Sequence, residues 1–250
     1  MDEPAKKTMN RTLKTSAVRV CRSGRAAVAE MKGTTHQFYE DRYRLLSSEI
    51  DLVKSASRGE IFAVFDGVSG ATRGMAAAQA MADALLKFFE EPQGHAPDTE
   101  GLARLIQTAN VEINDWGTMP GSDRPLGAAA GTIVWVHNGE ATLFHAGDTE
   151  AWLLQSGACT CVADSSRDGK VLVDYFGQGK NLAMKIRTFP FVRGNRLLLF
   201  TDGVTKVLNQ PTIEGALRST GLIDRAVRAL VEAAEHRRAP DDVTALMIEG

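Results

Sequence analysis

The stretch GTIVWVHNGEATLFHAGDTEAWLL, residues 131–154, contains three apolar runs separated by two short polar turns. The first turn carries Asn138 and Gly139, the dipeptide that most strongly predicts a tight hairpin between two strands. Strands joined by such short turns run antiparallel, because a parallel connection needs a dozen or more residues. This stretch therefore predicts an antiparallel sheet.

Apolar runs of the same kind recur along the chain, together with three segments of helical character. The helical segments are 71–90, 99–117 and 222–237, and each has apolar residues at helical spacing along one face. A helix with one apolar face must cover another element, so we expect an α+β fold in which helices pack outside antiparallel sheets. The remaining strand-like runs are 17–21, 25–31, 41–46, 60–65, 159–163, 170–176, 195–201 and 243–249.

Composition narrows the class of protein. The 250 residues include 29 Lys or Arg and 31 Asp or Glu, which leaves a net charge of −2 and favours no nucleic-acid partner. No run approaches the roughly 18 apolar residues of a membrane helix, and residues 1–15 lack the apolar centre of a signal peptide. The three cysteines are few, as in a reducing compartment. We expect a cytoplasmic monomer without membrane insertion, with a flexible extension at 1–15 and a single domain at 16–250.

Aspartates stand where the strand-like runs begin or end. Asp66 follows IFAVF, Asp202 follows RLLLFT, Asp241 and Asp242 precede VTALMI, and Asp148 lies in the turn after ATLFH. The end of one antiparallel strand lies beside the start of the next, so we expect Asp66, Asp202 and Asp241 to meet at one rim of the sheet. An aspartate in such a place is often only a turn former, and that alternative applies to each of them singly.

Carboxylates gathered at an apolar rim predict a bound cation. They repel one another and lose hydration, so a positive group should sit among them. Oxygen ligands favour Mg²⁺ or Mn²⁺ over Zn²⁺, which prefers histidine or cysteine. Gly67 follows Asp66 and lets the backbone approach an ion, so its carbonyl is a further candidate ligand.

Five segments that contain these residues resemble, in the expected order, the motifs of the metal-dependent protein phosphatase family (PPM, type 2C serine/threonine phosphatases) in its bacterial form. The resemblance covers about residues 25–249 and implies two antiparallel β-sheets packed as a central sandwich flanked by α-helices. The segments are HQFYEDRY at 36–43, VFDGVSG at 64–70, residues 131–154, RLLLFTDGVTKVL at 196–208 and APDDVTALMI at 239–248.

The resemblance implies a site with two metal ions and a weaker third position. Asp66 would bridge the ions and the Gly67 carbonyl would bind one of them, while Asp202 and Asp241 would hold the other. The family pattern favours Asp241 over Asp242, which spacing alone does not separate. The remaining implied residues are Asp148, which with Asp202 would form the third position, and Asp41 and Glu40, which would hold metal-bound water or bind directly.

The implied reaction is in-line attack on phosphorus by a metal-bridging hydroxide, which requires no serine or cysteine nucleophile. Two positions depart from the family pattern. His36 stands where the family usually has a phosphate-binding arginine, so it is the candidate phosphate ligand, with Arg42, Arg73 or Arg187 as open substitutes. Val68 stands where animal members carry a candidate acid, a histidine.

The resemblance implies a Mg²⁺- or Mn²⁺-dependent phosphatase that hydrolyses phosphoserine or phosphothreonine on a partner protein and opposes a serine/threonine kinase. Asp66, Asp202, Asp241 and Asp41 are the residues expected to carry catalysis. His36 in place of arginine leaves an alternative open, a phosphatase-like module that binds phosphoproteins without efficient turnover. A third possibility keeps the chemistry and changes the substrate to a phosphorylated regulator of the partner-switching type that controls sigma factors.

Overall fold

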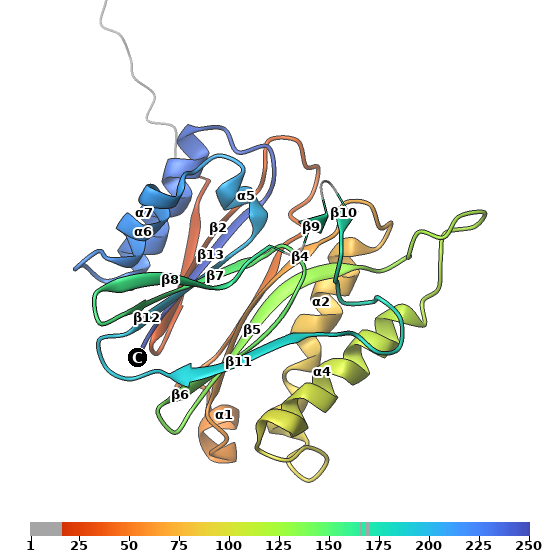
Figure 1. Cartoon of the computed structure of the whole chain (residues 1–250), viewed down its shortest axis with the longest axis horizontal. Helices are drawn as coiled ribbons and strands as arrows, with labels where there is room; N and C mark the ends of the chain where they lie inside the picture. Colours follow the sequence, from red (N-terminus) through yellow and green to blue (C-terminus); the bar gives the residue numbers. More distant parts are fainter. Residues whose placement is uncertain (1–16, 166, 169–170) are drawn as a thin grey trace, which may run out of the picture.

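The structure is a computed structural model that describes residues 17–165, 167–168 and 171–250. Two antiparallel sheets lie in its middle, and helices cover the outer face of each sheet (Figure 1). This arrangement confirms the predicted α+β sandwich. The expected flexible extension at 1–15 lies outside the described residues.

The first sheet contains six strands in the order β1-β2-β13-β12-β7-β8. Every neighbouring pair in this sheet is antiparallel, and β12 and β13 lie side by side at its centre. Its strands are β1 (Arg19–Ser23), β2 (Ala26–Met31), β7 (Glu150–Gln155), β8 (Ala158–Ala163), β12 (Arg196–Phe200) and β13 (Val243–Glu249).

The second sheet contains five antiparallel strands in the order β11-β6-β5-β4-β3. The hairpin between β5 and β6 turns at Asn138 and Gly139, whose φ angles of 50° and 79° confirm the predicted tight turn. Its strands are β3 (Arg42–Leu46), β4 (Glu60–Gly67), β5 (Ala129–His137), β6 (Glu140–Ala146) and β11 (Lys185–Pro190). A separate short pair is formed by β9 (Arg167–Asp168) and β10 (Val171–Leu172).

Each sheet has its own helical layer. On one side, α2 (Gly74–Ala84) and α4 (Thr99–Asn114) pack on the five-stranded sheet, and on the other, α6 (Gln210–Leu217) and α7 (Ile223–His236) pack on the six-stranded sheet (Figure 1). None of the helices in the described part of the chain is both long and apolar enough to cross a bilayer. The short helices are α1 (Asp51–Ala56), α3 (Lys87–Glu90) and α5 (Asp202–Thr205).

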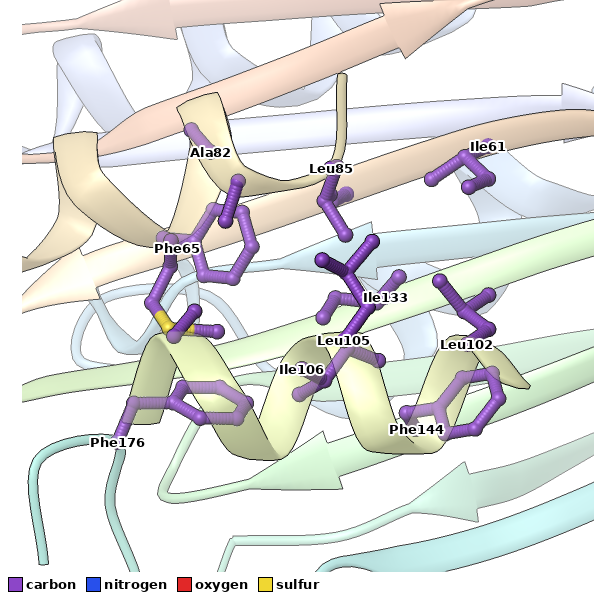
Figure 2. Packing of buried hydrophobic residues seen from close by; sticks show 14 of the residues in the cluster. Ile61, Phe65, Ala82, Leu85, Leu102, Leu105, Ile106, Ile133, Phe144 and Phe176 are labelled. Carbon is purple, nitrogen blue, oxygen red and sulfur yellow. The ribbon is translucent and has the colours of Figure 1, made fainter. Parts of the chain in front are cut away.

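The layers explain why the strands read as unbroken apolar runs. Along β4, Phe62 and Val64 pack between the two sheets, whereas Ile61 and Phe65 pack under α2 and α4. Figure 2 shows the second set, in which Ile61 and Phe65 lie among side chains of α4 and the neighbouring strands. Full burial of such a side chain stabilises the fold by about 1.5–3 kcal/mol. Because both faces are buried, β4 is a rigid support for the residue that ends it.

Two predicted elements differ in extent from the observed ones, and several observed elements were not predicted. The strand predicted at 170–176 is reduced in the described residues to β10 and an isolated bridge between Phe176 and Ala129. The helix predicted at 71–90 divides into α2 and α3, because the Leu86 N–H bonds to the Asp83 carbonyl three residues back. The exposed edge strand β11 and the short helices α1, α5 and α6 have too few apolar residues in register to be predicted.

Candidate active site

The aspartates at the strand ends meet at one end of the sandwich. Asp66, Asp148, Asp202 and Asp241 line a single cleft with a volume of about 330 Å³. Asp66 lies at the end of β4 in the five-stranded sheet, whereas Asp202 follows β12 and Asp241 precedes β13 in the six-stranded sheet. Asp148 lies in the turn from β6 to β7, which leads from one sheet to the other. The expectation of one rim of one sheet is therefore wrong, because the carboxylates meet between the two sheets.

Asp66 is the most crowded of these carboxylates. Its backbone pairs with Ala130 of β5, which fixes the direction of the side chain. The side chain keeps some exposure toward the cleft, but surrounding protein removes most of its hydration, and this burial raises the pKa of Asp66 well above its usual value. The negative charges of the other cleft aspartates and of Asp41 raise it further. A positive charge beside Asp66 would relieve both effects.

Asp202 and Asp241 share a positive partner that the sequence reasoning missed, Lys206. The Lys206 ammonium lies 2.8 Å from Oδ1 and 2.7 Å from Oδ2 of Asp202, and it also contacts Oδ2 of Asp241. Burial alone would lower the pKa of Lys206, but the hydrogen bonds to the two carboxylates outweigh it and raise the pKa. The signal in the sequence was the spacing, because residues four apart on a helix face one another.

Asp241 and Asp242 have different surroundings. Asp241 lines the cleft, whereas Asp242 is buried and its two oxygens accept the backbone N–H groups of Gly33, at 2.7 Å, and Glu40, at 2.5 Å. Asp242 therefore anchors the loop 33–40. The spacing of the sequence did not show which of the two adjacent aspartates faces the cleft, and in the structure it is Asp241.

His36, the candidate phosphate ligand, belongs to that loop and faces carboxylates. Its Nε2 lies 3.1 Å from Oδ1 of Asp241. Its Nδ1 lies 3.3 Å from Oδ2 of Asp242, at an angle that makes no hydrogen bond. The imidazole therefore lies beside the Asp241 oxygen that Lys206 does not contact, and the phosphate-binding role stays a prediction.

Asp41 lies behind the cleft rather than on its wall. The carboxylate is buried, and its Oδ2 accepts the hydroxyl groups of Thr201, at 2.8 Å, and Thr244, at 2.5 Å. The Tyr39 hydroxyl lies 2.5 Å from the Thr244 oxygen, so Tyr39 donates to Thr244 while Thr244 donates to Asp41. Burial raises the pKa of Asp41 well above its usual value. Thr201 directly follows β12 and Thr244 is the second residue of β13, so Asp41 is held where these two strands meet.

Glu40 and Gly67 are placed by backbone contacts. Glu40 is half-buried, donates its N–H to Asp242, and has a pKa raised by burial. A Cβ on Gly67 would lie 2.7 Å from backbone atoms of Gly74 and Met75, so this glycine allows α2 to begin against the end of β4. The close approach of the helix therefore explains the glycine at this position, and the binding of an ion by its carbonyl stays a prediction.

The three arginines considered for phosphate binding have other surroundings. Arg42 hydrogen-bonds to Gln79 and to the carbonyls of Tyr39 and Asp41. Arg73 stacks on the ring of Trp116 at 4.1 Å, and Arg187 lies exposed on β11. Of the described residues that line the cleft, Lys206 is the basic one.

The carboxylates of the cleft supply the oxygen donors that a divalent cation prefers, and Lys206 contacts two of them, Asp202 and Asp241. Asp66 is a dehydrated carboxylate among other carboxylates, which is the setting in which Mg²⁺ or Mn²⁺ binds oxygen ligands. In the part of the chain that the structure describes, no three side chains of His, Cys, Asp or Glu are arranged to hold an ion. One reason is visible, because Lys206 already bonds to the oxygens of Asp202 and Asp241 that an ion would need.

Comparison with solved structures supports the fold. The PPM Ser-Thr phosphatase MsPP from Mycobacterium smegmatis is 22% identical, with a TM-score of 0.71 over 90% of this chain and 97% of that chain. PppA, a regulatory component of T6SS in Pseudomonas aeruginosa, is 18% identical, with a TM-score of 0.74 over 92% and 99%. The catalytic domain of the serine threonine protein phosphatase PstP, solved with two manganese ions, is 20% identical, with a TM-score of 0.72 over 90% and 97%.

Sequence comparison identifies the family. No curated protein is significantly similar to the chain in sequence. The model of the family described as stage II sporulation protein E (SpoIIE) matches residues 59–249, a range that includes Asp66, Asp148, Asp202 and Asp241. The chain therefore belongs to the SpoIIE family and has the fold of the PPM-type phosphatase domain, as the resemblance in its motifs predicted.

Proposed function

We propose that the protein is a Mg²⁺- or Mn²⁺-dependent phosphatase that hydrolyses phosphoserine or phosphothreonine on a partner protein. The observation that carries this proposal is the convergence of four aspartates from both sheets on one open cleft. Membership of the SpoIIE family and the likeness in fold to PPM phosphatases support the reaction class. The manganese ions solved with PstP support the choice of metal.

The proposed metal ligands are the carboxylates of the cleft. Asp66 is the central ligand, with the Gly67 carbonyl beside it, and Asp202, Asp241 and Asp148 supply the remaining oxygens. When bound, Mg²⁺ or Mn²⁺ would lower the pKa of a water and neutralise charge on the phosphate. The role of the fold is to keep these oxygens fixed on two packed sheets, so that little reorganisation is needed during the reaction.

Asp41 is the proposed water-positioning residue. Its Oδ2 is held by two threonine hydroxyls, which leaves Oδ1 to face its surroundings in a fixed direction. A carboxylate fixed in this way orients a water molecule between itself and Asp66. Glu40 assists from the half-buried loop beside it.

The proposed partner is a phosphorylated protein rather than a small buried ligand, because the cleft is open and polar side chains form much of its wall. We expect an opposing serine/threonine kinase and a monomeric enzyme with one domain at 16–250. The three cysteines are unpaired, in keeping with the cytoplasm.

A hydrolysis assay tests the proposed reaction. The full chain is incubated with para-nitrophenyl phosphate, a phosphothreonine peptide and a phosphorylated partner-switching regulator, each with Mn²⁺, Mg²⁺ or chelator. We expect turnover that requires metal and is lost in chelator. Preference for the phosphorylated regulator over the peptide would assign the substrate class, and turnover that persists in chelator would contradict the proposal.

Lys206 favours one second candidate, a phosphoprotein-binding module with poor turnover. An ammonium already neutralises Asp202 and Asp241, so the metal site of an efficient enzyme is partly occupied by the chain itself. This candidate predicts that the protein binds a phosphothreonine peptide stoichiometrically but releases no phosphate in Mn²⁺. Phosphate release over many turnovers would exclude it.

A further inference from the structure

The Lys206 ammonium occupies a position between two proposed metal ligands that come from separate elements. Asp202 begins α5 and Asp241 precedes β13, and the ammonium contacts both oxygens of Asp202 and one of Asp241. Lys206 also lines the same cleft as Asp66 and Asp148. Its contacts are therefore part of the site and not of a remote surface.

The two carboxylates need a positive partner. Their side chains are only 11% and 16% exposed, so water solvates them poorly. Asp148 adds a further negative charge to Asp202. Without a cation, the pair would repel each other across the junction of α5 and β13.

A divalent ion and the ammonium compete for the same oxygens. Mg²⁺ binds carboxylate oxygens at about 2.1 Å and keeps a closed shell of ligands around it. An ammonium held within hydrogen-bond distance of the same oxygens lies in that shell and adds charge repulsion. Binding of the ion therefore requires that Lys206 move away from at least one of the two aspartates.

We propose that Lys206 is a resident counter-cation of the Asp202–Asp241 pair, which a divalent ion must displace, so that this lysine weakens metal binding there and leaves Asp66 as the first ion position. The inference rests on the metal site of the proposed function but not on turnover. It predicts that the wild-type protein binds one divalent ion more tightly and a second one more weakly. It also gives Lys206 a stabilising role when metal is absent.

Metal binding by the full chain tests this directly. Mn²⁺ is titrated by calorimetry and followed by electron paramagnetic resonance in the wild-type protein, in Lys206→Met and in the charge-conserving Lys206→Arg. We expect Lys206→Met to bind the weaker ion about tenfold more tightly, since a charge-assisted competitor is removed, and Lys206→Arg to remain near wild type. The matched control is Lys87→Met, which removes an exposed ion pair with Glu112 between α3 and α4. Equal affinities in Lys206→Met and Lys87→Met would overturn the inference, as would the absence of Mn²⁺ binding in all four proteins.

Thermal unfolding gives a second readout and guards against a variant that folds poorly. In chelator, Lys206→Met should melt below wild type, because two carboxylates lose their partner. Saturating Mn²⁺ should raise the melting temperature of Lys206→Met more than that of wild type. An equal rise in both proteins would count against the inference. If substitution of Lys206 changes the affinity for Mn²⁺ but the protein hydrolyses no phosphate ester, the proposed enzyme is refuted and the counter-cation role of Lys206 is supported.

Discussion

At the scale of single residues, the site brings together carboxylates whose ionised forms are unfavourable. Asp66 ends a strand buried on both faces and is surrounded by Asp41, Asp148, Asp202 and Asp241, so burial and repulsion both oppose its ionised form. Such an arrangement costs stability in the absence of a cation. It is the cost expected of a carboxylate placed for function rather than for folding.

This cost predicts a specific pH dependence in chelator. Unfolded Asp66 ionises near its ordinary pKa of 3.8, whereas folded Asp66 keeps its proton to higher pH. Between these values the folded state binds more protons, so the free energy of unfolding falls as pH rises through the window. Asp66→Asn removes this contribution and should be more stable than wild type in EDTA at pH 7.5, with a smaller fall between pH 5 and pH 7.5. Urea unfolding at the two pH values measures it, and an equal fall in both proteins would contradict the explanation.

The sequence predicted single residues well where a strand end marked them. Asp66, Asp202 and Asp241 were expected together because each adjoins an apolar run, Asp148 was added by the family resemblance, and all four line one cleft. Lys206 was missed because one lysine in a short helix looks like an ordinary surface charge. The partners of His36 were not predictable either, since they depend on how loop 33–40 folds back on Asp242.

At the scale of elements, the junction of α5 with β13 positions Asp202 against Asp241. Thr201 accepts the backbone N–H of Thr244 at 3.1 Å and donates to Asp41, which ties the end of β12 to the start of β13. Gly203 makes the close approach possible, because a Cβ at this position would lie 1.9 Å from the carbonyl oxygen of Asp242. The relative position of the proposed metal ligands Asp202 and Asp241 therefore depends on the glycine that directly follows Asp202.

Gly203→Ala should destabilise the protein and impair the site. The added methyl group meets backbone that cannot move independently, so we expect a loss of about 2 kcal/mol or more in the free energy of unfolding and weaker Mn²⁺ binding. Gly215→Ala is the control, because Gly215 lies in α6 with open space around its Cβ position and should gain about 0.5–1 kcal/mol from helix propensity. Chemical denaturation with and without Mn²⁺ measures both, and a neutral Gly203→Ala would show that the junction is not tight.

The elements were predictable where local chemistry was strong. The turn at Asn138 and Gly139, and the faces of α4 and α7, follow from local pattern alone. β11 was missed because most of its residues are exposed and do not alternate clearly. The strand predicted at 170–176 was wrong in extent. Phe176 packs into the helix-covered core, but its backbone forms only an isolated bridge with Ala129.

At the scale of the whole molecule, the site depends on the packing of one sheet against the other. Asp66 belongs to the five-stranded sheet, and Asp202 and Asp241 adjoin the six-stranded sheet. No local pattern in the sequence reports how two sheets pack, which is why the carboxylates were expected on one sheet. Phe62 and Leu199 are among the side chains that fix the distance between them.

Phe62→Ala should therefore reduce activity as well as stability. Loss of a fully buried ring between the sheets should cost about 3–5 kcal/mol and lower the rate per folded molecule. Phe88→Ala is the control, because Phe88 is equally buried but does not lie between the sheets. Phe88 belongs to α3 and contacts Trp135 in the core under the helices. Phe88→Ala should lose similar stability and keep its rate per folded molecule. Equal loss of rate in both variants would show that general loosening, rather than sheet packing, governs the site.

We propose that the Asp66 cleft hydrolyses a phosphate ester with the help of a divalent ion. The most direct test is phosphate release from a phosphothreonine peptide in Mn²⁺ by the wild-type protein and by Asp66→Asn, with folding of both checked by circular dichroism. We expect multiple turnovers by the wild-type protein and a rate at least about a thousandfold lower in Asp66→Asn, because loss of a central ligand removes charge stabilisation of the transition state. Equal rates in the two proteins, or no release by either one with Mn²⁺ bound, would contradict the proposed metal-dependent hydrolysis.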